Sequence, residues 1–154
     1  YTALSYAWGD PNSTKKIIMN GVEVSVGANL EAALRTLRKR PEFVNGLKLW
    51  ANALCINQTD LDEKENAVSR MLSVYQIASS VTIWLGPGNT ESATTVSTIQ
   101  DFLAGRSDDW ESASTEEYRT ELFRLYFATQ ILPAIIDLMD RAYWKRLWVM
   151  QEIS

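Results

Sequence analysis

Hydrophobic positions in the first half of the chain alternate between strand-like runs and helix-like stripes. Three short runs are rich in apolar and aromatic residues, and they span residues 1–8, 47–56 and 81–86. Each run has the length of a strand, and the second is apolar enough to predict a central strand buried on both faces. Between these runs, apolar residues recur every three or four positions over residues 30–37 and 61–78, which predicts two amphipathic helices.

Turn and cap signals predict how these elements begin and connect. The dipeptide Asn20-Gly21 separates two short β-forming runs, and it predicts a tight hairpin because both of its positions tolerate positive φ. Asn29 is placed to cap the first helix. Asp60, followed three residues later by Glu63, predicts a capping box at the start of the second helix.

The order strand, helix, strand, helix, strand predicts an α/β domain with a parallel sheet, because parallel strands need crossover helices. The hairpin is then an inserted feature. The second half of the chain predicts helices, marked by apolar spacing and a helix-starting proline, at Val96, Ile99, Leu103, about Glu116 and Pro133. A polar, acidic loop is expected at residues 105–115. We see no linker, so we expect one domain over residues 1–154.

Composition and charge narrow the class of protein. The 154 residues are 46% hydrophobic and 22% charged, which is ordinary for a soluble globular domain. The formal net charge of −4 argues against a general attraction to nucleic acid, and the basic residues within 35–40 are interpreted as the solvated end of a helix. A single cysteine fits a reducing compartment, and no apolar run approaches the roughly 20 residues of a membrane span. We therefore expect a cytoplasmic protein.

The chain contains no histidine, which restricts the chemistry open to it. Catalytic arrangements of the Ser-His-Asp or Cys-His kind are excluded. With one cysteine and no histidine, a zinc site is not expected either. An enzyme built from this chain would depend on carboxylates, hydroxyls, amides and backbone groups.

Polar residues follow the predicted strands at the edge of the sheet where ligands bind in open parallel sheets. The residues at these strand ends are Trp8, Gly9, Asp10, Asn57 and Gln58. Asn52 is a further candidate, because an amide inside an apolar run needs hydrogen-bond partners. The alternative interpretation is local: Asp and Asn form turns, and tryptophan packs.

The closing stretch AYWKRLWVMQEIS, residues 142–154, has the spacing of an amphipathic helix. On such a helix Glu152 lies one turn after Trp148, with its carboxylate against the indole. A carboxylate beside an indole in a cleft can act on a glycosidic bond. The simpler interpretation is a surface glutamate that pairs with Lys145 or Arg146, and the spacing leaves both open.

Three blocks of the sequence together resemble the fungal heterokaryon incompatibility (HET) domain, and they span nearly the whole chain. The blocks are YTALSYAWGD at 1–10, LWANALCINQTDLDEK at 49–64 and YWKRLWVMQE at 143–152. The resemblance implies a role in fungal non-self recognition that ends in the death of incompatible fusion cells. It also implies a piece of a larger protein, with self-association and other death-signalling domains as its partners.

HET domains are in turn distantly similar to TIR domains, many of which hydrolyse NAD with a glutamate in a WCxxE-type motif. The stretch WVMQE at residues 148–152 has the same Trp-to-Glu spacing, so the resemblance implies that Glu152 is the catalytic carboxylate and NAD the substrate. No metal or cofactor is implied. The residues implied to form the pocket are Tyr6, Trp8, Gly9, Asp10, Asn52, Asn57, Gln58 and Trp148. The implied fold is a TIR-like, flavodoxin-like parallel sheet with flanking helices and an inserted hairpin.

Two positions depart from the family pattern, which usually has Asp at the position of Asn52 and Gln at that of Ala67. If the acid is needed for toxicity, the amide of Asn52 in its place weakens the toxicity.

The alternative function is a non-catalytic module that self-associates and signals cell death. Its support is the acidic segment around Trp110 and the aromatic content of the chain.

Overall fold

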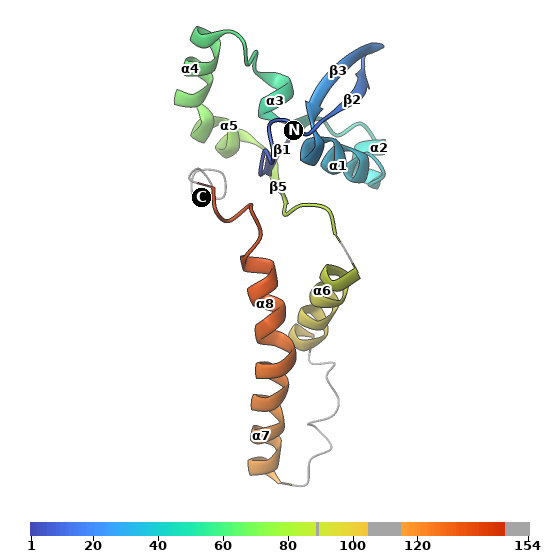
Figure 1. Ribbon diagram of the computed structural model, residues 1–154, viewed down its shortest axis with the longest axis vertical. Helices are drawn as coiled ribbons and strands as arrows, with labels where there is room; N and C mark the ends of the chain where they lie inside the picture. Colours follow the sequence, from blue (N-terminus) through green and yellow to red (C-terminus); the bar gives the residue numbers. More distant parts are fainter. Residues whose placement is uncertain (89, 105–114, 147–154) are drawn as a thin grey trace. The chain divides into compact units, whose positions relative to one another are not determined.

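The computed structural model describes residues 1–88, 90–104 and 115–146, which fall into two compact units (Figure 1). The first unit comprises residues 1–87 together with the segment that starts at Ala142, and it contains every strand among the described residues. The second unit is residues 88–141 and is helical. The first unit carries the edge of the sheet at which the sequence predicts a site.

A three-stranded parallel sheet forms the centre of the first unit, with β1 (Thr2–Tyr6) between β4 (Leu49–Trp50) and β5 (Ser80–Trp84). The predicted parallel α/β arrangement is confirmed. All five residues of β1 are buried, as a central strand requires. Because side chains alternate along a strand, Leu4 and Tyr6 lie on one face of the sheet and Ser5 on the other.

The run 47–56 does not form the predicted central strand. β4 has only two residues and lies at the edge of the sheet, and the chain then turns into the short helix α3 (Asn52–Cys55). Two backbone N–H groups of α3 donate to Ala51 O, each at 2.9 Å, which closes the helical turn. The prediction is wrong here because a short apolar run fits a strand or a helical turn equally well by composition.

The hairpin expected from Asn20-Gly21 is confirmed: β2 (Thr14–Met19) and β3 (Val22–Gly27) pair antiparallel. Asn20 has φ 53° and Gly21 has φ 79°, the positive values that this two-residue turn requires. The hairpin is a sheet of its own, and its inner side chains belong to the core, namely Ile17, Val24 and Val26.

One face of the parallel sheet packs against α1 (Ala28–Leu37), and this layer is the core of the first unit. Leu4 and Tyr6 cluster there with buried residues of the hairpin, of α1 and of the chain before α3, namely Val26, Leu30, Ala33, Leu37 and Ala51. The helical spacing that predicts α1 is the spacing of these buried positions.

Asn29 does not cap α1, contrary to the prediction. The N-cap of α1 is Gly27, and no side chain caps the helix. Instead Asn29 Nδ2 donates to Ala7 O at 2.6 Å, and Asn29 Oδ1 accepts from Trp84 Nε1 at 2.9 Å. Asn29 therefore ties the ends of β1 and β5 to the first turn of α1.

The helix predicted over residues 61–78 is divided into α4 (Leu61–Ser69) and α5 (Met71–Ile77). Arg70 between them has φ −104° and ψ 2°, which is outside the helical region. Of these two helices, only α5 has a buried residue, Tyr75. The ring of Tyr75 lies edge-on to that of Trp50, with the ring centroids 5.8 Å apart. Tyr75 Oη also donates to a backbone carbonyl of β1 at 3.2 Å, so α5 is fixed to the sheet while α4 is not.

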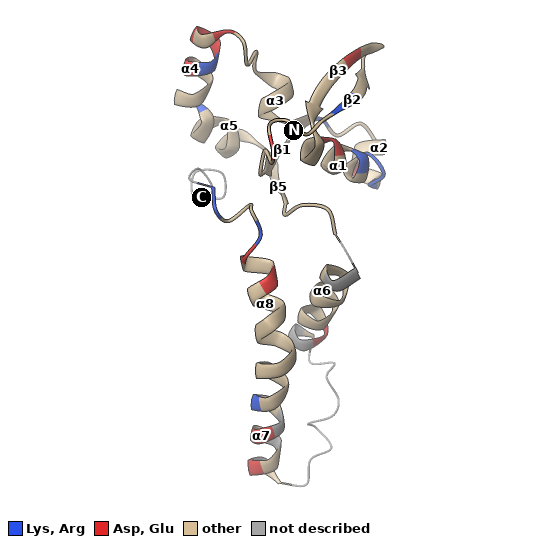
Figure 2. Ribbon diagram, in the orientation of Figure 1, with Lys and Arg blue, Asp and Glu red and all other residues tan. Residues whose placement is uncertain are grey.

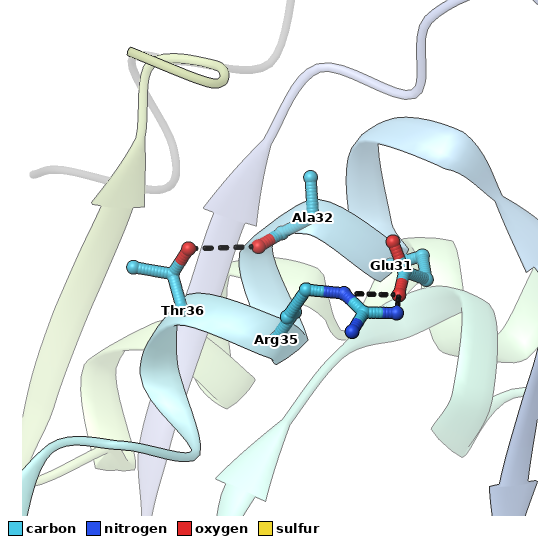
Figure 3. A network of polar contacts seen from close by, with 4 residues as sticks. All are labelled: Glu31, Ala32, Arg35 and Thr36. Atoms are coloured by element: carbon cyan, nitrogen blue, oxygen red, sulfur yellow. Dashed lines mark hydrogen bonds and ion pairs between the residues drawn. The ribbon is translucent and has the colours of Figure 1, made fainter.

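The outer face of α1 is polar, and its charges are paired. Arg35 Nε donates to Glu31 Oε1 at 2.8 Å, one turn away on the same helix (Figure 3). Arg40 lies 3.8 Å from Glu42 of the next helix, α2 (Pro41–Val44). Acidic and basic residues accordingly lie next to each other on these helices (Figure 2). The basic residues within 35–40 thus form a solvated, partly neutralised helix end.

The second unit contains the predicted helices α6 (Thr90–Leu103), α7 (Glu116–Tyr126) and α8 (Leu132–Met139). The acidic loop expected at 105–115, with Trp110, lies outside the described residues up to 114. No helix in the described part of the chain is long and apolar enough to cross a membrane.

A π-helix at Phe127–Ile131 joins α7 to α8, so the helical backbone continues through Pro133. Proline has no N–H, and its ring crowds the carbonyl four residues earlier. A wider turn before the proline accommodates that ring without a break. The proline predicts the start of α8 to within one residue but not its continuity with α7.

Candidate functional site

Three of the predicted binding residues lie at the carboxyl end of β1 and are joined by hydrogen bonds. Tyr6 Oη donates to Asn52 Oδ1 at 3.2 Å, and Gln58 Nε2 donates to Asn52 O at 3.1 Å. Tyr6 is buried, whereas Asn52 and Gln58 are half-buried. This edge of the sheet therefore connects the end of the central strand to α3 and to the loop that follows it, where open parallel sheets bind ligands.

Asn52 uses its side-chain oxygen as an acceptor for two donors. Besides Tyr6 Oη, Asn52 Oδ1 accepts from Ala53 N at 2.8 Å. A carboxylate oxygen would accept from the same two donors, and hydrogen bonds to an ionised acceptor are stronger. The local geometry is therefore compatible with the aspartate that the family pattern has at this position.

Trp8 and Gly9 form the loop that leaves β1. Trp8 is 50% exposed, which leaves a flat aromatic surface open at the end of the central strand. Gly9 has φ +79°, a conformation that favours glycine. The loop is tied down just before Trp8, because Asn29 donates to Ala7 O.

Asp10 and Asn57 use their side chains in their own turns. Asp10 Oδ1 accepts from Asn12 N at 2.9 Å, and Asn57 Oδ1 accepts from Thr59 N at 3.1 Å. These are the local turns that the alternative interpretation of both residues expects. Both residues are exposed, and their role in binding stays a prediction.

The N-terminus of α4 holds the loop that carries Asn57 and Gln58. Asp60 Oδ1 accepts from Glu63 N at 3.0 Å, which confirms the first half of the predicted capping box. The second half is replaced, since Glu63 Oε1 accepts from Asn57 N at 3.0 Å. The Glu63 carboxylate thus fixes the loop beside the candidate site.

A polar cluster on the opposite face of the sheet was not predicted from the sequence. Ser5 Oγ and Tyr143 Oη are 2.7 Å apart, and Arg146 Nη1 donates to Ser5 Oγ at 3.3 Å. Ser5 and Tyr143 are both buried. The available signal was a serine inside a largely apolar run, which is the kind of signal that singled out Asn52.

The predicted catalytic residue Glu152 and its neighbour Trp148 lie outside the described residues. Helix α8 ends at Met139, and residues 142–145 form a turn, so the helix expected over the whole closing stretch is wrong at its start. Within the described ranges, no group of three or more Cys, Asp or Glu side chains could hold a metal ion.

The family model described as heterokaryon incompatibility protein (HET) matches residues 1–152. Heterokaryon incompatibility protein 6, OR allele, of Neurospora crassa is 28% identical over 182 aligned residues, which cover 99% of this chain and 27% of that protein. The chain thus spans about a quarter of the length of this curated relative. No solved structure matches the chain. The resemblance carried by the three sequence blocks is confirmed.

Proposed function

The chain belongs to the heterokaryon incompatibility (HET) family, and we propose that it acts in fungal non-self recognition by triggering the death of incompatible fusion cells. The observation that carries this proposal is the family match over residues 1–152, which takes in both compact units. The curated relative carries heterokaryon incompatibility in its name, and this chain aligns with 27% of its length.

Inducible expression of the chain in a filamentous fungus tests this role. We expect uptake of a vital dye and arrested growth within hours of induction. Leu30→Ala should be harmless to the cell, because it removes packing at the centre of the core and so lowers the amount of folded protein. Leu30 is 1% exposed. Normal growth of cells that accumulate the folded parent protein would contradict the proposal.

At the level of chemistry, we propose that the lethal activity is hydrolysis of NAD at the carboxyl edge of the sheet. The support is the hydrogen-bonded set Tyr6, Asn52 and Gln58 at that edge, together with the Trp-x-x-x-Glu spacing of residues 148–152. The half-exposed indole of Trp8 provides a surface on which a flat base stacks. The half-buried amides of Asn52 and Gln58 at the same edge of the sheet are groups that can hydrogen-bond a ribose.

The reaction breaks the bond between the nicotinamide nitrogen and C1 of the ribose. Nicotinamide leaves as a neutral molecule with the bonding electron pair, and the positive charge stays on the ribose. The Glu152 carboxylate stabilises that charge, and water adds to the carbon with release of one proton. Because the leaving group is neutral, this step proceeds without a metal ion to stabilise it.

The test is nicotinamide release from NAD, followed by chromatography, with the purified chain at high concentration or fused to an oligomerising tag. We expect Glu152→Gln to lower the rate by about 10²–10⁴-fold, the usual contribution of one acid–base group. Glu65→Gln is the matched control, since Glu65 is an exposed glutamate on α4 and should keep full activity. Absence of release by the parent, or equal rates for the parent and Glu152→Gln, would refute NAD hydrolysis.

A second candidate is a non-catalytic module that self-associates, and one observation favours it. Exposed apolar side chains recur along the helices of the second unit, at Tyr118, Leu125, Leu132, Ile136 and Met139. Exposed apolar side chains that gather on one surface often mark a protein interface. Light scattering across a concentration series should show growth in mass that Ile136→Asp abolishes, and a strict monomer at all concentrations would exclude this function.

A further inference from the structure

Ser5 carries a hydroxyl inside β1, the most buried of the strands in the described part of the chain. It is fully buried on β1, where a polar side chain is stable only with hydrogen-bond partners. The partners come from the far end of the chain: Tyr143, 138 residues away in sequence, at 2.7 Å, and Arg146 at 3.3 Å. The contact therefore joins the central strand to the segment just before Trp148 and Glu152.

The anchored segment is itself held in a compact turn. Arg146 N donates to Tyr143 O at 3.3 Å, and the Arg146 guanidinium lies 5.4 Å from the centre of the Tyr143 ring. The ring of Trp144 meets the Tyr143 ring edge-on, with centroids 5.0 Å apart. One buried hydroxyl thus holds a cluster of two aromatic rings and a cation, rather than a single side chain.

We propose that Tyr143 and Arg146 are positioning residues, which dock on Ser5 and hold the segment leading to Glu152 at the sheet. The sequence supports this, because Glu152 follows Arg146 by only six residues. The docking fixes Arg146 at β1, and the chain continues from there toward Glu152. This inference rests on the proposed function for the role of Glu152 in catalysis.

Ser5 is well placed for this task because of its neighbour in the strand. Tyr6, the next residue, directs its side chain to the other face and bonds to Asn52. The two polar clusters therefore lie on opposite faces of the same strand end. The carboxyl edge of β1 is where a ligand can be reached from both faces, from Asn52 on one side and from the docked segment on the other.

Tyr143→Phe tests the docking with the smallest change, because it keeps the ring and removes one hydroxyl. Hydrogen exchange read by mass spectrometry should show about tenfold faster exchange in peptides from residues 142–154, with peptides from α1 unchanged. In the NAD assay we expect kcat to fall at least fivefold with KM unchanged. Ser25→Ala is the control, since it removes an exposed hydroxyl on β3 that lies outside the candidate site.

Further variants keep the test decisive if Tyr143→Phe folds poorly. Ser5→Ala removes the other partner of the same hydrogen bond, and Ser25→Ala, at an exposed position of β3, is its control as well. Arg146→Lys keeps the charge and loses the planar fork of donors. Because the three residues act as one unit, Ser5→Ala combined with Tyr143→Phe should lose no more activity than the worse single variant.

The two readouts separate failure of this inference from failure of the proposed function. If the parent releases no nicotinamide, the proposal of NAD hydrolysis is refuted. Selective exchange in residues 142–154 would still establish the docking. Exchange that accelerates equally in α1 would overturn the inference, because the contact would then serve general stability. Selective exchange with unchanged kcat in an active protein would overturn it as well.

Discussion

Replacing Asn29 with aspartate separates the role that the sequence predicts for this residue from the role that the structure shows. Near a helix N-terminus aspartate is at least as favourable as asparagine, because carboxylates suit that end of the helix dipole. In the structure, however, Asn29 Nδ2 donates to Ala7 O at 2.6 Å, and aspartate has no donor for that carbonyl. We therefore expect Asn29→Asp to destabilise the first unit.

The magnitude follows from the hydrogen bonds of Asn29. Leaving Ala7 O without its donor costs roughly 1–3 kcal/mol. The interaction of the new carboxylate with the helix dipole offsets about 0.3–1 kcal/mol of this loss. The hydrogen bond from Trp84 Nε1 is kept, because a carboxylate oxygen accepts it as well. The net loss is about 1–2 kcal/mol, or roughly 2–8 °C in Tm for a chain of this length. Asn29→Ala loses both bonds and should cost roughly 2–4 kcal/mol.

Urea denaturation at pH 7, followed by tryptophan fluorescence, measures these free energies of unfolding. Asn12→Asp is the matched control, because it adds the same charge at an exposed position nearby in the chain, and it should change stability by less than about 0.5 kcal/mol. An Asn29→Asp protein as stable as the parent, or more stable, would refute the bridging role and restore the capping interpretation.

Three further predictions test the core, the candidate site and its loop. Leu30→Ala should lower the free energy of unfolding by about 2–5 kcal/mol, because Leu30 is 1% exposed, while Leu61→Ala at a 77% exposed position should change it by less than about 0.5 kcal/mol. Equal losses in urea titrations would contradict the assigned core. Asn52→Asp should keep the Tm within about 3 °C of the parent, because the acceptor of both hydrogen bonds is kept; a larger fall in a thermal scan would show that the amide nitrogen matters. Gly9→Ala should cost about 1–2 kcal/mol, since φ +79° is strained for any residue with a Cβ. Gly88→Ala, where φ is not positive, is its control in the same titration, and an equal loss there would refute backbone strain as the cause.

The candidate site was predictable in part, and the reason differs from residue to residue. Tyr6, Asn52 and Gln58 could be grouped from the sequence because strand ends of a parallel sheet meet at one edge. Ser5 and Tyr143 were missed because their pairing spans 138 residues, and no local pattern records such a partner. The resemblance to the family selected Glu152, which lies outside the described residues.

The sequence by itself determined the features that depend on neighbouring residues. The Asn20-Gly21 hairpin, the periodic helices and the parallel order of the strands all follow from turn geometry, side-chain spacing and the length of the crossovers. The tertiary structure decided what depends on distant partners. It placed β1 at the centre of the sheet instead of the run 47–56, and it used Asn29 as a bridge. Each of these outcomes depends on which surfaces meet in the folded chain, and a burial pattern or a hydrogen bond between distant residues leaves no periodic trace in the sequence.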